Sequence, residues 1–446
     1  MKKLIKLSAL ATSVTLLAGA ASSALGGTVT VVTSFPKELT GIYKTAFEKA
    51  NPGIKLEILN KSTTQGIAYV RELPEGQRPD IFWASAPDAF EVLVGQKLLT
   101  DVAGLANKNA PTKVGNYPIN DPNGMYLGQA LGGYGLMWNT RYMAANKVPA
   151  PAQWSDLTKP VYFRHAAISA PSRSGTTHLT VETMLQGEGW DKGWSQLLQI
   201  GGNAAAITER SFGVPDGVNN GQFGVGLVID FFGLASKYSG FPVEFVYPDV
   251  TAVVPANIAL ISGSKNAEEA KKFISYSVSL EGQQLLLDPK ISRLPILPAS
   301  ALGGKVPAGY PDPFEIAKRA KVNFDSDLSE SRYNVVSALF DQTITFRHKE
   351  LQAATKAIHA ATAALQKKPN ANGQALLKQA RDLAFAPVVG ASLAADKSFL
   401  ALFTANKKDA AANKQMTGLE DRWNAQALNH YERAKTLAEQ ALAAAR

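Results

Sequence analysis

The chain has 446 residues and no cysteine, so it is long enough for more than one domain and cannot depend on disulfides. It carries 46 basic and 37 acidic residues, and without the three lysines at its N-terminal end the counts are 43 and 37, a net charge of +6. This mild excess suits a small anionic ligand or solubility alone, and it lacks the clustered basic pattern of nucleic-acid binding.

Residues 1–24 have the pattern of a secretory signal peptide. Three lysines precede an apolar run from Leu7 to Ala18, and small residues follow. The run is too short to span a bilayer, so we expect export to the periplasm, with cleavage after Ala20 or Ala24. Because the chain has no cysteine to carry a lipid, the mature protein should be free there, without direct membrane insertion.

Strand, loop and helix alternate from Thr28 onward. Short apolar or β-branched runs predict strands at residues 28–33, 54–59 and 80–83, and each is followed by a helical pattern. Repeated units of this length indicate an α/β fold with a parallel sheet and helices on both of its faces.

The same alternation continues through the middle of the chain. Further strands are predicted at residues 132–138, 166–170, 223–230 and 253–261, and helices at 177–185 and 267–279. We therefore expect a first α/β lobe of residues 28–130 and 258–310, and a second lobe of residues 131–257. Extended crossover segments near residues 131–140 and 245–258 should join the lobes as a hinge, and one continuous sheet would contradict this expectation.

Residues 311–446 are expected to form an all-helical C-terminal extension. From about Phe340 the sequence is rich in Ala, Leu, Lys and Gln, with helical periodicity and few β-branched runs. Breaks at residues 369–373 and at Ala386-Pro387 divide it into three to five helices. This composition favours a structural role for the extension over a catalytic or ligand-binding one.

Hydroxyl-rich loops follow several predicted strands and precede helices. Ligands bind at the carboxyl ends of parallel strands, and helix starts offer unpaired N–H groups and a positive dipole end. Two such sets facing across a cleft would hold a phosphate or carboxylate without a metal, whereas each loop taken singly is an ordinary N-cap. The candidate ligand-binding residues are Thr33, Ser34, Thr63, Thr64 and Ser85 in the first lobe and Ser172, Ser174, Gly175, Thr176 and Thr177 in the second.

Two charged residues complete the candidate site. Arg210 either clamps an anion or pairs with Glu209 or another carboxylate. Asp230 ends an apolar strand, where it either accepts hydrogen bonds from ligand hydroxyls or caps a helix. Trp83 and Tyr134 form either an aromatic wall or, more in keeping with their residue types, part of the core.

The sequence gives little support to an enzyme. It has no cysteine nucleophile, no Gly-x-Ser-x-Gly elbow and no phosphate-binding Gly-x-x-x-x-Gly-Lys loop, and its five histidines are scattered without metal-ligand spacing. We therefore expect no catalytic residue, no cofactor and no metal site.

Several motifs give the chain a specific family likeness. It resembles the extracellular solute-binding proteins of the ferric-iron-binding type, over about residues 28–298, and with its helical tail it is most similar to the phosphoglycerate-transport regulatory branch, beside sugar-phosphate-binding relatives. The motifs are Asp80-Ile81-Phe82-Trp83-Ala84-Ser85, Pro171-Ser172-Arg173-Ser174-Gly175-Thr176, Ala267 to Ile274, Ser279-Leu280-Glu281-Gly282-Gln283 and Arg293-Leu294-Pro295.

The resemblance implies a two-lobed periplasmic binding protein fold of type II and the capture of a small anionic solute for an ABC transporter permease. An organic phosphate, such as a sugar phosphate or a phosphoglycerate, is the expected solute, and the protein is expected to be a monomer. A ligand sensor for a membrane histidine kinase is an alternative, because it would use the same closure of two lobes.

One stretch departs from the family pattern. Iron-binding members carry an Asn-His-Tyr-Tyr-like stretch whose tyrosines ligate the metal, whereas this chain has Ile229-Asp230-Phe231-Phe232. Phenylalanine offers no oxygen to Fe³⁺, so the alternative of a ferric-iron-binding protein is chemically disfavoured. This departure does not affect the residues expected to bind the anion, which lie in the hydroxyl-rich loops and at the helix starts.

Overall fold

The computed structural model describes residues 26–404 and 409–445. The predicted signal peptide, residues 1–24, lies outside the described residues. Within the described part of the chain, no helix combines the length and the apolar character needed to cross a bilayer.

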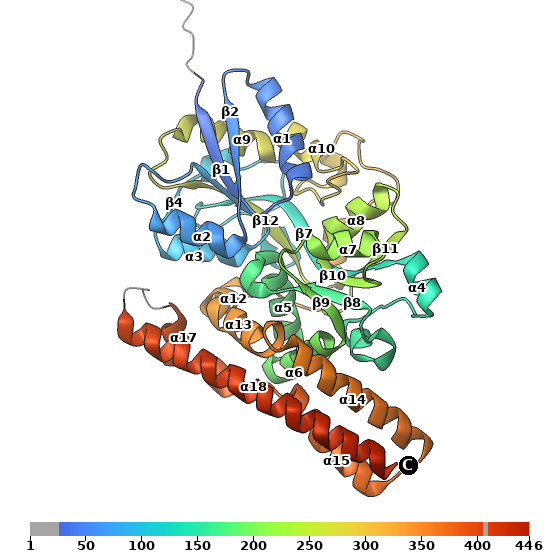
Figure 1. The fold of residues 1–446 in the computed structure, drawn as a ribbon. Coiled ribbons are helices and arrows are strands. Elements are labelled where there is room, and N and C mark those ends of the chain that lie inside the picture. The colour runs from blue at the N-terminus through green and yellow to red at the C-terminus, as the bar shows by residue number, and fades with distance from the viewer. Residues whose placement is uncertain (1–25, 405–408, 446) are drawn as a thin grey trace, which may run out of the picture.

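The first lobe is a sheet covered by helices on both faces (Figure 1). Strands β1 and β2 pair in parallel, as do β1 and β3, and alternate residues of β1 such as Val29 and Val31 are fully buried. Its elements are β1 (Thr28–Thr33), α1 (Lys37–Ala50), β2 (Lys55–Asn60), α2 (Thr63–Glu72), β3 (Ile81–Ala84), α3 (Pro87–Gly95), β4 (Leu99–Thr100), η1 (Ala103–Leu105), β5 (Lys113–Val114), β6 (Tyr117–Pro118), α9 (Ala267–Val278), α10 (Leu280–Leu285) and η5 (Ala299–Ala301).

The second lobe repeats this architecture. Strand β8 pairs in parallel with both β9 and β10, so these three strands end at one edge of the sheet. Its elements are α4 (Thr140–Asn146), η2 (Trp154–Thr158), η3 (Pro160–Tyr162), β8 (Ala166–Ser169), η4 (Pro171–Arg173), α5 (Gly175–Glu188), α6 (Trp190–Asn203), β9 (Ala204–Thr208), α7 (Gly213–Asn219), β10 (Val225–Ile229), α8 (Asp230–Tyr238) and β11 (Val243–Val246).

Two long strands connect the lobes. The first half of β7 (Leu127–Asn139) pairs with β12 (Val253–Ile261), and its second half pairs with β10 and β11. The strands therefore follow one hydrogen-bonded path, β2-β1-β3-β12-β7-β10-β8-β9. The two-lobed fold is confirmed, whereas the expectation of separate sheets is wrong at β7, because this strand is long enough to belong to both lobes. The proposed domain boundaries at residues 131 and 257 fall inside these strands.

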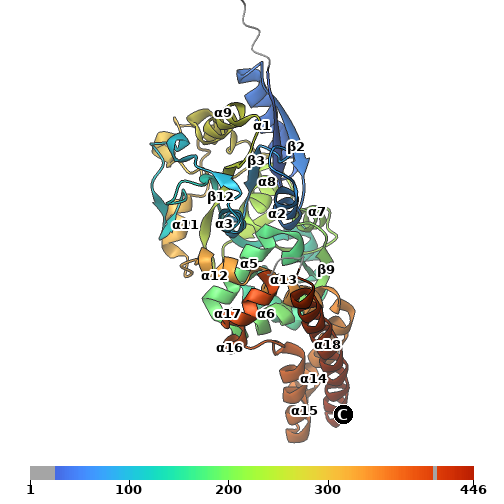
Figure 2. The ribbon, with the colours of Figure 1, turned by 90° about the vertical axis from the view of Figure 1, so that its left-hand side faces the viewer.

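The rest of the described chain is helical. After η5 it forms α11 (Pro313–Arg319), α12 (Ser326–Ser331), α13 (Tyr333–Phe340), a π-helical turn η6 (Asp341–Thr345), α14 (His348–Lys367), α15 (Ala371–Phe385), α16 (Ala391–Ala394), α17 (Lys397–Thr404) and α18 (Ala410–Ala444). Helices α14, α15 and α18 run side by side and project away from the lobes (Figures 1 and 2). The predicted all-α extension and both predicted breaks are confirmed.

Buried polar contacts attach this extension to both lobes. Arg332 donates from Nε and Nη2 to the two carboxylate oxygens of Glu182 on α5, at 2.8 and 2.7 Å, and its guanidinium lies over the Trp190 ring. On the first-lobe side, Ser329 Oγ donates to Asp88 Oδ2 on α3 at 2.7 Å. His178 of α5 is 3.2 Å from the same carboxylate oxygen, so both lobes and the extension meet at Asp88.

Candidate ligand-binding site

The predicted hydroxyl loops of the two lobes meet directly. The backbone N–H of Gly175, at the start of α5, donates to Thr63 Oγ1, at the start of α2, at 3.3 Å. A Cβ atom on Gly175 would lie only 2.7 Å from Ala86 Cβ and 2.8 Å from Thr63 Oγ1, so this close approach requires glycine. Two helix N-termini from opposite lobes therefore point at one region, as the sequence predicted.

Two of the candidate hydroxyls cap their own loops. Ser174 Oγ accepts a hydrogen bond from the N–H of Thr177, as a helix N-cap, and Thr33 Oγ1 accepts from the N–H of Phe35. Ser34 does not cap the first helix, because α1 begins at Lys37 after Pro36 without a side-chain cap. The remaining candidates of these loops, Ser85, Thr176 and Thr177, are buried near the strand ends.

Thr64 and Ser172 lie elsewhere. The Ser172 hydroxyl is buried without a hydrogen-bond partner, and the Thr64 hydroxyl interacts with Tyr333. Both side chains line a cavity of about 570 Å³ between the first lobe and the helical extension. The structure thus separates these two residues from the others of the predicted set, and nothing in the sequence indicated that the extension would cover them.

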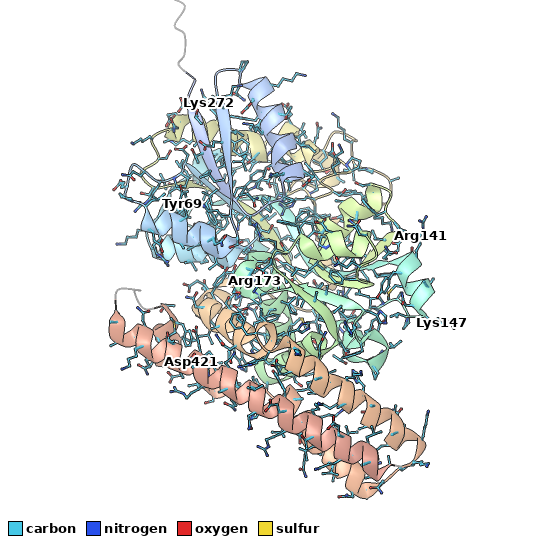
Figure 3. All side chains as sticks on the ribbon, in the orientation of Figure 1. Tyr69, Arg141, Lys147, Arg173, Lys272 and Asp421 are labelled. Carbon is cyan, nitrogen blue, oxygen red and sulfur yellow. The ribbon has the colours of Figure 1, made fainter. Side chains whose placement is uncertain are left out.

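Arg210 reaches across to the first lobe. Its Nη2 donates to Asn60 Oδ1 at 3.2 Å and to the Lys61 carbonyl at 3.4 Å, and partial burial lowers the pKa of its guanidinium. The sequence left open a pairing with Glu209, but that carboxylate binds Arg173, at 2.8 Å. Arg173 lies near the centre of the molecule, above the extension (Figure 3).

Asp230 is the first residue of α8 and is fully buried. Its Oδ2 accepts hydrogen bonds from the Gly133 N–H at 2.7 Å and from the Tyr247 hydroxyl at 2.9 Å, while its Oδ1 has no partner. Burial raises the pKa of this carboxyl to about 6, although the two hydrogen bonds oppose the rise. An acceptor atom is therefore available at the junction of the lobes.

Arg293 is a candidate ligand-binding residue that the sequence analysis did not select. Its guanidinium is fully buried between the rings of Phe35 and Phe231, 4.5 and 4.7 Å from their centroids. None of its three nitrogens has a hydrogen-bond partner, and burial lowers its pKa to about 10 while Asp230 and nearby tyrosines oppose this. A buried cation with every donor unused is costly, so this residue marks a place where a ligand oxygen or water belongs.

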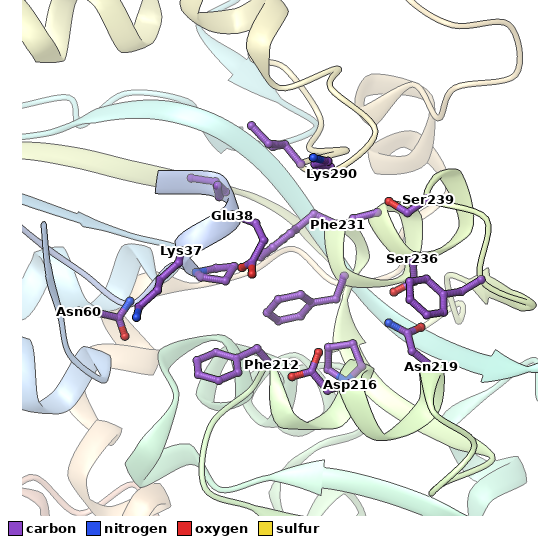
Figure 4. Close-up of a pocket in the computed structure, with 17 residues that line it drawn as sticks. Lys37, Glu38, Asn60, Phe212, Asp216, Asn219, Phe231, Ser236, Ser239 and Lys290 are labelled. Carbon is purple, nitrogen blue, oxygen red and sulfur yellow. The ribbon is translucent and has the colours of Figure 1, made fainter. Parts of the chain in front are cut away.

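A cavity of about 500 Å³ opens between the lobes next to this cluster. The start of α1 and the end of β2 line it on one side, and α7 and α8 line it on the other, with Phe231 between them (Figure 4). Lys37 and Asn60 lie at one end, and Ser236 and Ser239 lie at the other. Eight of the seventeen lining residues are polar or charged, including the carboxylates of Glu38 and Asp216, and apolar side chains form the rest of the walls. A concave site of this size suits a small molecule.

Two phenylalanines stand in the stretch that the sequence comparison set against the tyrosines of iron-binding proteins. Phe231 and Phe232 occupy the positions of the tyrosines expected in iron-binding relatives, and both rings are buried. Within residues 26–404 and 409–445, no group of three or more His, Cys, Asp or Glu side chains is arranged to hold a metal ion. Trp83 and Tyr134 are fully buried, in keeping with a place in the core.

The fold and this interlobe site define a two-lobed solute-binding protein. The family model described as "bacterial extracellular solute-binding protein" matches residues 76–315, more than half of the chain. A phosphoglycerate transport regulatory protein, PgtC of Salmonella typhimurium, is 31% identical over 373 residues, which cover 82% of this chain and 87% of that protein. The chain therefore belongs to the bacterial extracellular solute-binding protein family.

Solved structures with the same fold include proteins of two kinds. The periplasmic binding protein AfuA from Actinobacillus pleuropneumoniae, with exogenous fructose-6-phosphate bound, has a TM-score of 0.64 at 17% identity, covering 72% of this chain and 99% of that one. The apo ferric ion-binding protein A of Pasteurella haemolytica has a TM-score of 0.56 at 16% identity, covering 72% and 98%. At these identities the likeness establishes the fold alone.

Proposed function

We propose that the protein captures a small anionic solute in the periplasm, an organic phosphate such as a sugar phosphate or a phosphoglycerate, and delivers it to an ABC transporter permease. The observation that carries the proposal is the meeting of Thr63 and Gly175, at the N-termini of helices from opposite lobes. Helix N-termini bind phosphate groups through their N–H groups and dipoles, so an anion here would replace Thr63 Oγ1 as the acceptor for the Gly175 N–H. The family of the chain and the names of its relatives support the same class of solute.

The anion is held chiefly by the loop Ser172–Thr177, with Thr33-Ser34 and Thr63-Thr64 on the facing lobe and Arg210 closing the cleft from the β9 side. Of these, Thr64 and Ser172 now point toward the extension, so their part in binding requires a shift of their side chains. Arg293, whose donors have no hydrogen-bond partner, adds positive charge at the junction of the lobes, beside Asp230.

Asp230 serves the neutral part of the solute. A carboxylate beside a phosphate would repel it, whereas Asp230 Oδ1 is free to accept hydrogen bonds from hydroxyl groups. This polarity favours a polyol phosphate over free phosphate.

Calorimetry on a Ser174→Ala/Thr176→Val variant tests the anion site, with glucose 6-phosphate, 3-phosphoglycerate and inorganic phosphate as probes. Two lost charge-assisted hydrogen bonds, at about 1.5–3 kcal/mol each, weaken binding roughly a hundredfold or more. Asn370→Ala is the control, because it removes the N-cap of α15, where the side chain accepts from the Gly373 N–H at 2.7 Å far from the cleft. Unchanged affinity in the double variant would place the anion elsewhere.

A sensory role is the second candidate, because the Salmonella relative is a phosphoglycerate transport regulatory protein. In that role the closed protein is recognised by a membrane histidine kinase instead of a permease. Deletion of the gene distinguishes the two: loss of solute uptake with intact expression of the transporter supports delivery, and loss of solute-induced expression supports sensing.

A further inference from the structure

The cavity between the first lobe and the helical extension differs in character from the cleft. It measures about 570 Å³, is lined by α2, the loop before α5, α13, α17 and α18, and shares no lining residue with the cavity between the lobes. Its size is that of a site for a small organic molecule.

Buried polar atoms without partners converge on this cavity. Tyr333 is only 3% exposed and lines the cavity, and its hydroxyl interacts with the side chain of Thr64. An unsatisfied buried group costs about 1–3 kcal/mol, so several at one place indicate that something fills the space and bonds to them. The lining atoms without a hydrogen-bond partner are Ser172 Oγ, Ser337 Oγ and Asp341 Oδ1.

Among the described residues that line the cavity, acidic side chains outnumber basic ones. The carboxylates of Glu330, Asp341 and Glu420 stand against the cation Arg71, which is 3.5 Å from Glu72 on its own helix. Burial, reinforced by neighbouring carboxylates, raises the pKa of both Glu330 and Glu420, as expected where acidic groups lack a counter-charge.

The backbone at this cavity is also unusual. Asp341 begins the π-helical turn η6, which interrupts the path from α13 to α14. Such turns occur frequently at functional sites, because they re-aim side chains that a regular helix would direct elsewhere. Asp341, the first residue of the turn, lines the cavity, and its Oδ1 has no hydrogen-bond partner.

We propose that this cavity is a second binding site, for a small organic cation that carries ammonium groups. Ammonium N–H groups would satisfy the orphan hydroxyls and carboxylates and supply the missing positive charge. An anionic solute is disfavoured here by the three carboxylates, so the two sites select ligands of opposite charge.

Occupation of this site favours the closed arrangement of the lobes. Its lining joins Thr64 of the first lobe, Ser172 of the second and Tyr333 of the extension, so a ligand that contacts all three binds the closed form more tightly. By linkage the cation then strengthens solute binding in the cleft, and the solute strengthens cation binding by the same factor. This coupling, but not the site itself, rests on the proposed function.

Isothermal calorimetry and thermal shift with spermidine test the site on the mature full-length chain, with glucose and inorganic phosphate as comparison ligands. Glu420→Gln removes one lining charge while keeping the shape, and Ser337→Leu fills the cavity. Asp421→Asn is the matched control, because Asp421 is the adjacent, exposed carboxylate on α18 (Figure 3).

The proposal is supported if spermidine binding is saturable, if each lining variant lowers the spermidine affinity at least tenfold, and if the control lowers it less than twofold. If Ser337→Leu does not fold, Glu420→Gln decides alone. The proposal is overturned if spermidine does not bind, or if Asp421→Asn lowers the spermidine affinity as much as the lining variants do. It is also overturned if crystals grown with spermidine show only water in this cavity. The Ser174→Ala/Thr176→Val variant, which tests the site in the cleft, should bind spermidine with unchanged affinity. The two proposals can therefore fail independently.

Discussion

Replacing Arg332 with methionine tests how firmly the helical extension is attached to the second lobe. The change removes two charge-assisted hydrogen bonds and leaves Glu182, which is fully buried, without its cation. Loss of one partner from a buried ion pair costs about 3–5 kcal/mol. Because Gln186 Nε2 still donates to Glu182 Oε2, at 3.1 Å, we expect a value near 3 kcal/mol, the lower end of this range.

Urea denaturation followed by circular dichroism gives the free energy of unfolding, and limited proteolysis shows whether the extension is released first. The double variant Glu182→Met/Arg332→Met buries no charge, so its stability should return to within about 1 kcal/mol of the wild type. The reasoning is refuted if the Arg332→Met variant loses less than about 1 kcal/mol, or if the double variant is as unstable as the single one.

Three further outcomes are expected. The pKa of Asp230 is about 6, against the usual 3.8, so the folded chain holds a proton that the unfolded chain releases. Raising the pH from 4 to 7 should therefore lower the stability of the wild type by up to about 3 kcal/mol relative to Asp230→Asn. Denaturation curves of both proteins at both pH values check this, and a stability difference that does not change with pH contradicts it. In Gly175→Ala the new Cβ would collide with Thr63 and Ala86, so solute affinity should fall at least tenfold and the radius of gyration from small-angle scattering should increase. The control Gly41→Ala, at an exposed position of α1 with open space around it, should change neither quantity. An unaltered affinity in Gly175→Ala would show that the lobes need not approach this closely. Finally, excess chelator should leave solute binding intact in calorimetry, and a visible charge-transfer band with stoichiometric Fe³⁺ would show that a metal belongs to the site.

The sequence pattern predicted best where local propensity and burial agree. The β-branched run of β1, the amphipathic α9 and the two breaks in the extension are all where the periodicity placed them. Strand β9 was missed, because Ala204, Ala205 and Ala206 have little β propensity and become a strand only through pairing with β8.

The candidate site was predictable in part. Thr63 and Gly175 do meet across the cleft, since topology brings the carboxyl ends of strands together. Arg293 carried a signal that was available, a single cation within the largely apolar stretch from Ile291 to Leu297. The second cavity could not be predicted, because it depends on how the extension packs against α2, and periodicity carries no information about such distant contacts.

The pairing of β12 with β3 has a consequence for the order of folding. Strand β3 is paired with β1 early in the chain, but its other edge stays open until β12 is available, after the whole second lobe. Closing so long a loop is slow, because chain entropy is lost before the distant contacts form. The second-lobe strands β8, β9 and β10 are closer in sequence, so that lobe should acquire its structure first, and hydrogen-exchange labelling during refolding should find protection in β10 before protection in β3.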